Sequence, residues 1–470
     1  MEIKKERRKL IILGALILTA VIQTGMLWLG GMSGHNFLKK TVQYEPIMPT
    51  NIWFVETSNT NTGVAGSLAY RLADMMGNEK REYERLIGEL AKLIERQGEK
   101  KPLKKIEGVD WSRLLSMPSV IYEYEFPIEL SAILGESRHT LIEDRIDYVF
   151  LYSKNKFEKE ATLYFVNSEE NFLYEMNIMG AFEDMEKIYK ALTDDELKRH
   201  MIAYQPSATI DKVRLAGNSF LPTSSQETLL EYDVLTAYNP IDLSSEEGYE
   251  VLESKINGLF VSPLVKERVY QDEKVIYTED MKTLVVYRPE GVIEYLNLSP
   301  RNQQASTSVL KGYNVALEFL KRVQVLPKSV EGQLYLADVQ QKGPDLIYSF
   351  DMMYEGYRVQ LSEKVKAKLG IESLVQIVVR GKDVMEAYFS TLEIEPKPLP
   401  PRALKTHYLE PIDQLYAFFD KQGIEEFMID HLELVYFVED IGQEIDMTWG
   451  AVYNHEWYYP LIMRQMLGGK

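Results

Sequence analysis

The chain has 470 residues, no cysteine and a formal net charge of −18 at pH 7. Because 45% of its residues are hydrophobic and 26% are charged, it can bury a core, which excludes a wholly disordered protein. The acidic balance argues against nucleic acid as a partner. The absence of cysteine excludes disulfides, thiolate metal sites and thiol nucleophiles.

An apolar segment close to the N-terminus is the strongest local signal. Residues 10–31 (LIILGALILTAVIQTGMLWLGG) contain no charged side chain, and they are long enough to cross a hydrocarbon core of roughly 30 Å as a helix. The segment is preceded by five basic residues, Lys4, Lys5, Arg7, Arg8 and Lys9. The positive-inside rule therefore places the N-terminus in the cytoplasm and the chain after Gly31 outside.

A cleaved signal peptide is the alternative explanation of this segment. Such a peptide usually has an apolar region of about 7–15 residues that ends in a small-x-small cleavage site. Here the apolar run is longer, and residues 30–33 (GGMS) match that site poorly. We expect a single-pass protein of the cell membrane, with a cytoplasmic stub at 1–9, a transmembrane helix at 10–31 and the bulk of the chain extracytoplasmic.

Polar and small side chains within this predicted helix are candidate contacts with another membrane helix. Thr19 and Gln23 are four residues apart and share a helix face, with Ala15 and Thr24 close to them. Small residues let a second helix approach, and an amide in hydrocarbon is costly unless a partner satisfies it. Alternatively, Gln23 reaches water at the outer interface, and the threonines are ordinary residues of a membrane helix.

Periodicity in the next part of the chain predicts an N-terminal extracytoplasmic α+β domain at 36–205. Apolar spacing predicts helices over 78–97 and 182–201. Alternating or continuous apolar runs predict strands over 120–126, 146–152, 161–167 and 172–178. Residues 205–228 contain Pro206, Gly217 and Pro222, which is typical of a linker, and we place that linker at 206–228.

A central α+β domain is predicted at 229–395. Its expected helices cover 249–260 and 309–322. Its expected strands cover 283–287, 292–298, 333–339, 345–354, 357–361, 374–380 and 384–394.

A small C-terminal α+β domain is predicted at 411–470, after a proline-rich linker at 396–410. Residues 395–401 (EPKPLPP) carry four prolines, a composition that favours an extended spacer over a packed sheet. A helix over 411–421 and strands over 431–438, 445–453 and 457–462 follow. The predicted fold class is α+β, with antiparallel sheets and packed helices behind the transmembrane helix.

Motifs for catalysis or metal binding are missing from the sequence. It lacks G-x-S-x-G, G-x-G-x-x-G, a Walker loop, H-E-x-x-H and an EF-hand loop. His455-Glu456 is half of a zincin motif, but Tyr459 occupies the position of the second ligand. The S-x-x-K pairs Ser153/Lys156 and Ser308/Lys311 lack the motifs that accompany them in penicillin-binding enzymes. We therefore predict a binding or regulatory protein and no enzyme, cofactor or metal.

Several short passages resemble the YycH family of membrane-anchored regulators in Firmicute bacteria. Residues 126–130 with 144–146 resemble its FP-x-x-L … D-R-I passage, and residues 259–260 with 295–297 resemble its LF … Y-x-N passage. Residues 351–359 resemble a passage ending in Y-x-N/E-G-x-P-V, although Arg358 stands where the family tends to have proline. Residues 434–461 resemble the family's last strands.

This resemblance implies a function in two-component signalling. It implies a regulator of a YycG/WalK-like sensor histidine kinase that controls cell-wall metabolism, acting through its transmembrane helix and exterior domains beside a companion YycI-like single-pass protein. A cell-surface module that binds peptide or glycan is the alternative, because 30 Tyr, 17 Phe and 5 Trp could furnish an aromatic sheet face. A wall hydrolase without a familiar motif is a third hypothesis.

Overall fold

The computed structural model describes residues 44–460 with several gaps. The gaps are 60–64, 73–79, 96–102, 136–141, 143, 153–159, 180–203, 207–212, 216–217, 223–228, 272, 281, 300–306, 324, 332, 407, 425–426 and 455. The predicted stub at 1–9, the transmembrane helix at 10–31 and the helix over 182–201 therefore lie outside the described residues. Within the described residues, no helix combines the length and the apolar character needed to cross a membrane.

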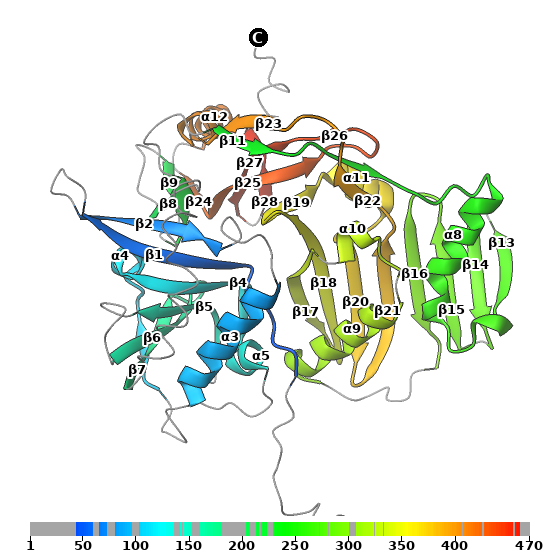
Figure 1. The fold of residues 1–470 in the computed structure, drawn as a ribbon, viewed down its shortest axis with the longest axis horizontal. Helices are drawn as coiled ribbons and strands as arrows, with labels where there is room; N and C mark the ends of the chain where they lie inside the picture. The colour runs from blue at the N-terminus through cyan, green and yellow to red at the C-terminus, as the bar shows by residue number, and fades with distance from the viewer. Residues whose placement is uncertain are drawn as a thin grey trace, which may run out of the picture. The chain divides into compact units, whose positions relative to one another are not determined.

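A nine-stranded antiparallel sheet forms the N-terminal part of the described chain (Figure 1). Its order is β10-β8-β2-β1-β4-β5-β6-β7-β3. These strands are β1 (Asn51–Asn59), β2 (Ala65–Arg71), β3 (Lys105–Glu107), β4 (Ser119–Glu129), β5 (Arg145–Tyr152), β6 (Glu160–Asn167), β7 (Phe172–Met179), β8 (Tyr204–Pro206) and β10 (Phe220–Pro222).

Among the described residues, three helices accompany this sheet: α3 (Lys80–Glu95), α4 (Trp111–Ser116) and α5 (Leu130–Leu134). The apolar face of α3 is buried at Leu86, Leu90 and Leu93, which belong to the same core as Ile52 of β1 and Val149 of β5. The helix predicted over 78–97 is thus confirmed, because its apolar side chains recur at helical spacing and find a sheet to cover.

A twelve-stranded sheet holds most of the remaining chain. Its path is β13-β14-β15-β16-β21-β20-β18-β19-β25-β27-β28, and β17 also pairs with β18. These strands are β13 (Glu267–Gln271), β14 (Lys274–Glu279), β15 (Thr283–Arg288), β16 (Val292–Asn297), β17 (Leu334–Lys342), β18 (Asp345–Tyr354), β19 (Tyr357–Leu361), β20 (Val375–Arg380), β21 (Asp383–Ser390), β25 (His431–Val438), β27 (Met447–Tyr453) and β28 (Glu456–Tyr458). All its pairs are antiparallel except the parallel pair of β19 with β25.

Helices and short sheets complete the described fold. The helices are α8 (Glu246–Ile256), α9 (Val309–Val323), α10 (Lys328–Glu331), α11 (Glu363–Leu369) and α12 (Leu409–Lys421), with 3₁₀ turns η1 (Asn257–Leu259) and η2 (Pro263–Val265). The short strands are β9 (Val213–Leu215) with β24 (Phe427–Ile429), β11 (Leu229–Tyr232) with β23 (Arg402–Lys405), and β22 (Glu393–Pro396) with β12 (Leu235–Tyr238) and β26 (Glu444–Ile445).

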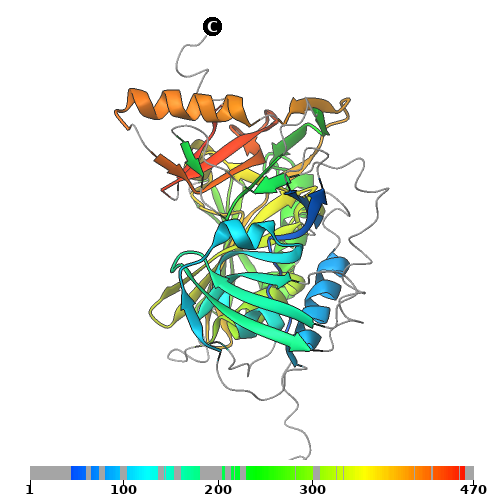
Figure 2. The same ribbon diagram turned by 90° about the vertical axis from the view of Figure 1, so that its left-hand side faces the viewer.

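Helices pack on the twelve-stranded sheet through buried aromatic side chains. Phe319 of α9 contacts Tyr295 of β16, with ring centroids 5.0 Å apart. Phe419 of α12 contacts Tyr453 of β27 with centroids 4.8 Å apart, and Figure 2 shows α12 over these last strands. The expected α+β class with helices packed on sheets is confirmed for the described residues.

Residues 205–228, where the composition predicts a linker, contain short strands. The strands β8, β9 and β10 lie in this segment, and Phe220 of β10 pairs with Pro206 of β8. Pro222 is tolerated because β10 is the edge strand of the sheet, and Pro206 because β8 pairs with its other neighbour, β2, only at Tyr204, so neither missing N–H interrupts a central ladder.

The proline-rich segment also contributes to a sheet, contrary to the prediction. Pro396 ends β22 and pairs with Leu235 of β12, and β22 is an edge strand in which a missing N–H breaks no central ladder. Residues 402–405, in the predicted linker at 396–410, form β23. Whether 36–205, 229–395 and 411–470 are separate domains stays a prediction.

Candidate functional site

The residues predicted as transmembrane contacts, Ala15, Thr19, Gln23 and Thr24, lie outside the described residues. The described residues contain no group of three or more His, Asp or Glu side chains that could hold a metal ion. Ser308, from one of the S-x-x-K pairs, directly precedes α9, and its Oγ accepts a hydrogen bond from the backbone N–H of Lys311 at 3.5 Å. This is the contact of a helix-capping serine, so the pair has a structural explanation.

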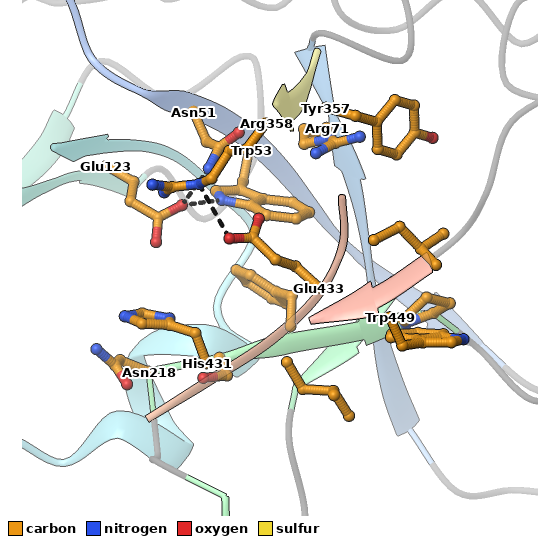
Figure 3. Close-up of a pocket in the computed structure, with 15 residues that line it drawn as sticks. Asn51, Trp53, Arg71, Glu123, Asn218, Tyr357, Arg358, His431, Glu433 and Trp449 are labelled. Atoms are coloured by element: carbon orange, nitrogen blue, oxygen red, sulfur yellow. Dashed lines mark hydrogen bonds and ion pairs between the residues drawn. The ribbon is translucent and has the colours of Figure 1, made fainter. Parts of the chain in front are cut away.

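A small cavity lies where strands from both large sheets meet (Figure 3). Its volume is about 60 Å³. It is lined by side chains of β1, β2, β4, β10, β19, β25 and β27, including Asn51, Trp53, Arg71, Glu123, Phe220, Tyr357, Arg358, Glu433 and Trp449. A cavity of this size holds water or a small polar group, whereas drug-sized ligands need roughly 300–1,000 Å³.

Glu123 of β4 organises the polar wall of this cavity. Its Oε2 accepts hydrogen bonds from Nε1 of Trp53 at 2.7 Å and from Nδ2 of Asn51 at 3.0 Å. Its Oε1 accepts from the hydroxyl of Tyr148 at 2.9 Å. Burial, together with the charges of Glu123 and Asp147, raises the pKa of Tyr148, so that hydroxyl stays protonated and keeps donating.

Arg358 of β19 forms the second polar group. It lies between two carboxylates whose strands are far from β19 along the chain. Its Nη1 is bonded to Oε1 of Glu125 in β4. Its Nε lies 2.9 Å from Oε1 of Glu433 in β25, and Figure 3 shows Glu433 directed at the guanidinium. Burial alone would lower the pKa of Arg358, but the two carboxylates more than offset it and hold that pKa above its usual value.

The contacts of Arg358 and Arg71 connect the two large sheets, whereas those of Glu123 lie within the nine-stranded sheet. Glu123 and Glu125 are two residues apart in β4 and therefore lie on the same face of the nine-stranded sheet. Arg358 and Glu433 belong to adjacent strands of the twelve-stranded sheet. Arg71 of β2 also reaches across, with its guanidinium carbon 4.5 Å from the ring centroid of Tyr357 in β19.

The polar groups of the cavity hold the surrounding strands in place and leave room for a bound water molecule. Each carboxylate of the cavity is already paired with a donor or a cation, and the hydroxyl of Ser219, which also lines the cavity, donates to the backbone carbonyl of Asp430 at 3.0 Å. Oδ1 of Asn51 is buried and accepts no hydrogen bond in the described structure. Its Nδ2 is fixed by Glu123, so Oδ1 is available to a water molecule in the cavity.

Sequence analysis did not find this cluster. The alternation in 120–126 places Glu123 and Glu125 on one face of a strand, but it does not indicate what covers that face. Arg358 was noted only as a departure from a family pattern. Its two partners are 233 and 75 residues away along the chain, and no local pattern reports contacts over such separations.

Comparisons by sequence give no relative. No family model matches the chain, and no curated protein matches it. Comparison of structures gives the crystal structure of YycH from Bacillus subtilis, with a TM-score of 0.53 and 12% sequence identity, over 90% of this chain and 98% of that one. A second structure, an uncharacterized protein from Eubacterium rectale, has a TM-score of 0.34 and 10% identity, over 53% of this chain and 84% of that one.

The similarity to YycH shows that the chain has the YycH fold. This confirms the fold that the short sequence passages imply. At 12% identity it concerns the fold alone.

Proposed function

We propose that this protein is a membrane-anchored, extracytoplasmic regulator of a two-component sensor histidine kinase that controls cell-wall metabolism. The observation that carries the proposal is the shared fold, which extends over 90% of this chain and 98% of the YycH chain. A similarity over nearly all of both chains supports a shared way of acting more strongly than a match to one domain would.

The character of the described site fits a regulator better than an enzyme. The polar groups around the cavity are used to align strands, and each of its acids has a donor or a cation beside it. An interaction protein needs surfaces in a fixed relative position. The contacts of Arg358 with Glu125 and of Arg71 with Tyr357 provide that position between the two sheets.

The aromatic composition gives little support to the alternative of glycan binding. The largest fully buried side chains include Tyr122, Tyr277, Tyr287, Tyr348 and Tyr436. Among the described aromatic side chains, Tyr238 and Tyr270 are the exposed ones. Most of the aromatic residues therefore serve the core, and a broad stacking platform for sugar rings is not formed by the described surface.

The proposed mechanism uses the predicted helix at 10–31 and the exterior surfaces together. The helix would lie beside the transmembrane helices of a YycG/WalK-like kinase, with a YycI-like protein as companion. Contacts that favour one of two kinase states need a coupling free energy of only about 1–3 kcal/mol. The coupling would thus pass through the membrane and the exterior.

Reconstitution with a YycG/WalK-like sensor kinase from the same organism tests the proposal. The full chain and the kinase are placed together in proteoliposomes, and kinase autophosphorylation is measured with and without the chain. We expect a change of several-fold in either direction. An unchanged rate, together with no co-purification from detergent, would refute the regulatory function.

A pair of substitutions in the predicted helix tests the membrane contacts. Gln23→Leu should weaken association with the kinase, because it removes an amide that a partner helix satisfies. Val21→Leu is the matched control, since it lies about 200° around the helix from Gln23. Equal association of both variants would leave Gln23 as a tolerated polar residue.

A further inference from the structure

Four large aliphatic side chains are exposed together at one end of the twelve-stranded sheet. Val261 is 89% exposed, Leu264 100%, Val265 53% and Leu298 46%. We call these four residues the apolar tip. Single exposed hydrophobic residues are ordinary, but a group of them at one place marks a binding surface.

The backbone of the apolar tip is held by specific contacts. The buried carboxylate of Glu279, at the end of β14, accepts hydrogen bonds from the backbone N–H groups of Val261, at 3.0 Å, and Ser262. The N–H of Leu298 donates to the carbonyl of Lys282 in the β14–β15 turn at 2.8 Å. These contacts place 261–265, Leu298 and the turn at the same end of the sheet and keep their apolar side chains pointing outward.

The apolar tip lies close to the point where the described chain begins. The N–H of Glu45 donates to Oδ1 of Asn314 in α9 at 2.8 Å. At the end of α9, a Cβ added to Gly258 would lie only 2.7 Å from the carbonyl oxygen of Val323, so η1 rests directly on the helix. The nine residues from Asn314 to Val323 span about 14 Å, and the tip begins three residues after Gly258. Figure 1 shows the start of the described chain and the end of α8 toward the same end of the ribbon.

The predicted anchor limits how far this end can be from a membrane. Twelve residues separate Gly31, the end of the predicted transmembrane helix, from Tyr44. Twelve residues reach at most about 40 Å when fully extended. The chain at Tyr44 can therefore lie no farther than about that distance from the end of the predicted helix.

We propose that the apolar tip inserts into the interfacial layer of the outer leaflet of the membrane that anchors the chain. The proposal rests on the membrane anchoring in the proposed function. Contact at the tip would make a second attachment and restrict the orientation in which the exterior domain meets its partner. A protein held by its transmembrane helix alone has no such restriction.

The chemistry of the tip favours lipid over a protein strand. Charged side chains beside the tip are paired: Lys282 lies 3.6 Å from Asp280, and Lys266, which follows Val265, lies 3.6 Å from Glu253. These pairs cancel, so they do not repel anionic lipid although the chain as a whole is acidic. The neighbouring strand β13 has one partner strand among the described residues, β14, and its outer backbone groups need water or another strand. Those groups cannot enter hydrocarbon, which limits the contact to the tip.

The absence of cysteine makes a direct measurement possible, because one introduced cysteine is labelled at a single position. Leu264→Cys is modified with a nitroxide in the full chain, in vesicles of phosphatidylethanolamine and phosphatidylglycerol. Collision of the nitroxide with oxygen, which concentrates in lipid, is compared with collision with a water-soluble nickel chelate. We expect the oxygen-to-nickel ratio to be several-fold higher at residue 264 than at Leu399→Cys, a 43% exposed leucine between β22 and β23.

A third label separates the failure of this proposal from the failure of membrane anchoring. Ile17→Cys lies in the predicted transmembrane helix and should report lipid. Lipid at residue 17 with a water-like signal at 264 would overturn the tip contact alone. Protection of 264 from both reagents when the kinase is added would show a protein contact and also overturn it. A water-like signal at residue 17 would overturn the anchor and the tip contact together.

Discussion

Arg358 is the residue on which the contact between the two sheets depends most. Its side chain is 13% exposed, and those of Glu125 and Glu433 are 22% and 25% exposed. Taking three charges out of water is costly, and the cost is offset only while the cation stays between its two anions. An ion pair of an exposed arginine contributes much less to the free energy of unfolding, because water screens its charge.

Replacement of Arg358 should therefore destabilise the protein strongly. Arg358→Met leaves Glu125 and Glu433 without their cation, and we expect the free energy of unfolding to fall by up to about 3–5 kcal/mol. Urea-induced unfolding of the full chain in detergent measures the loss.

The matched control removes the charges together. The variant Arg358→Met/Glu125→Gln/Glu433→Gln carries no uncompensated anion and should recover most of the loss, because replacing a whole buried ionic cluster is often nearly neutral. If the triple variant is less stable than Arg358→Met, the carboxylates have other roles that the charge argument omits.

Asp147 of β5 gives a prediction of pH dependence. Its side chain is 5% exposed and accepts hydrogen bonds from the N–H and hydroxyl of Ser168. Burial outweighs these bonds and raises the pKa of Asp147 from 3.8 to about 6. The folded state therefore binds this proton more tightly than the unfolded state does. The protonated carboxyl of Asp147 thereby contributes on the order of 2–3 kcal/mol to the free energy of unfolding. This contribution is fully present below pH 3.8 and is lost as the pH rises through 6.

Asp147→Asn should consequently raise the unfolding temperature at pH 7.5 and leave it nearly unchanged at pH 4, as followed by circular dichroism. Asp144→Asn is the control, and it should lower the unfolding temperature at neutral pH instead of raising it. The hydroxyl of Tyr174 and the ammonium of Lys105 lower the pKa of Asp144, so its contribution is present at neutral pH and lost on acidification. Equal destabilisation by Asp147→Asn at both pH values would contradict the argument.

At the scale of single elements, α9 shows how close packing overrides helix propensity. A Cβ added to Gly312 would lie 2.3 Å from the hydroxyl oxygen of Tyr348. Tyr348 is fully buried, and its hydroxyl donates to the carbonyl of Val309 at 2.7 Å, so the ring has no room to retreat. Glycine is therefore required in the first turn of this helix.

Gly312→Ala should cost about 1–3 kcal/mol of stability, as overpacking does, although alanine ordinarily stabilises a helix interior. The control is Gly88→Ala in α3, where an added Cβ meets nothing within 4 Å. There the substitution should gain about 0.5–1 kcal/mol. Thermal unfolding of both variants checks the pair, and similar shifts in the two would disprove the packing explanation.

The elements that sequence analysis predicted best are those whose pattern is complete within the element. The helix expected over 309–322 is found at Val309–Val323, because its apolar residues lie on one face and a sheet covers that face. β1 was not predicted, because its continuous apolar run, Ile52 to Val55, is only four residues long, and periodicity cannot tell so short a run in a strand from one in a buried helix. The cavity could not be predicted for a related reason. The strands that meet there come from segments far apart along the chain, and a local pattern does not report their contacts.

At the scale of the whole molecule, the twelve-stranded sheet joins parts of the chain that composition separates. β25 pairs in parallel with β19, from Arg358↔Val435 to Leu361↔Val438, and thereby attaches the strands after the proline-rich segment to those before it. One buried core contains residues from both sides, including Val359, Leu369, Leu415 and Trp449. Apolar contacts of this kind make two segments unfold together.

Cleavage of the proline-rich segment should therefore leave the molecule intact. A protease site inserted between Leu399 and Pro400 is accessible, because Leu399 is 43% exposed. After cleavage of the full chain in detergent, we expect both fragments to elute together and to unfold in one thermal transition near that of the uncut protein, since the β19–β25 pair and the shared core remain. The same insertion without cleavage is the control. Release of the C-terminal fragment, or a separate transition for it, would instead establish residues 411–470 as an independent domain and would make the parallel strand pair a contact between domains.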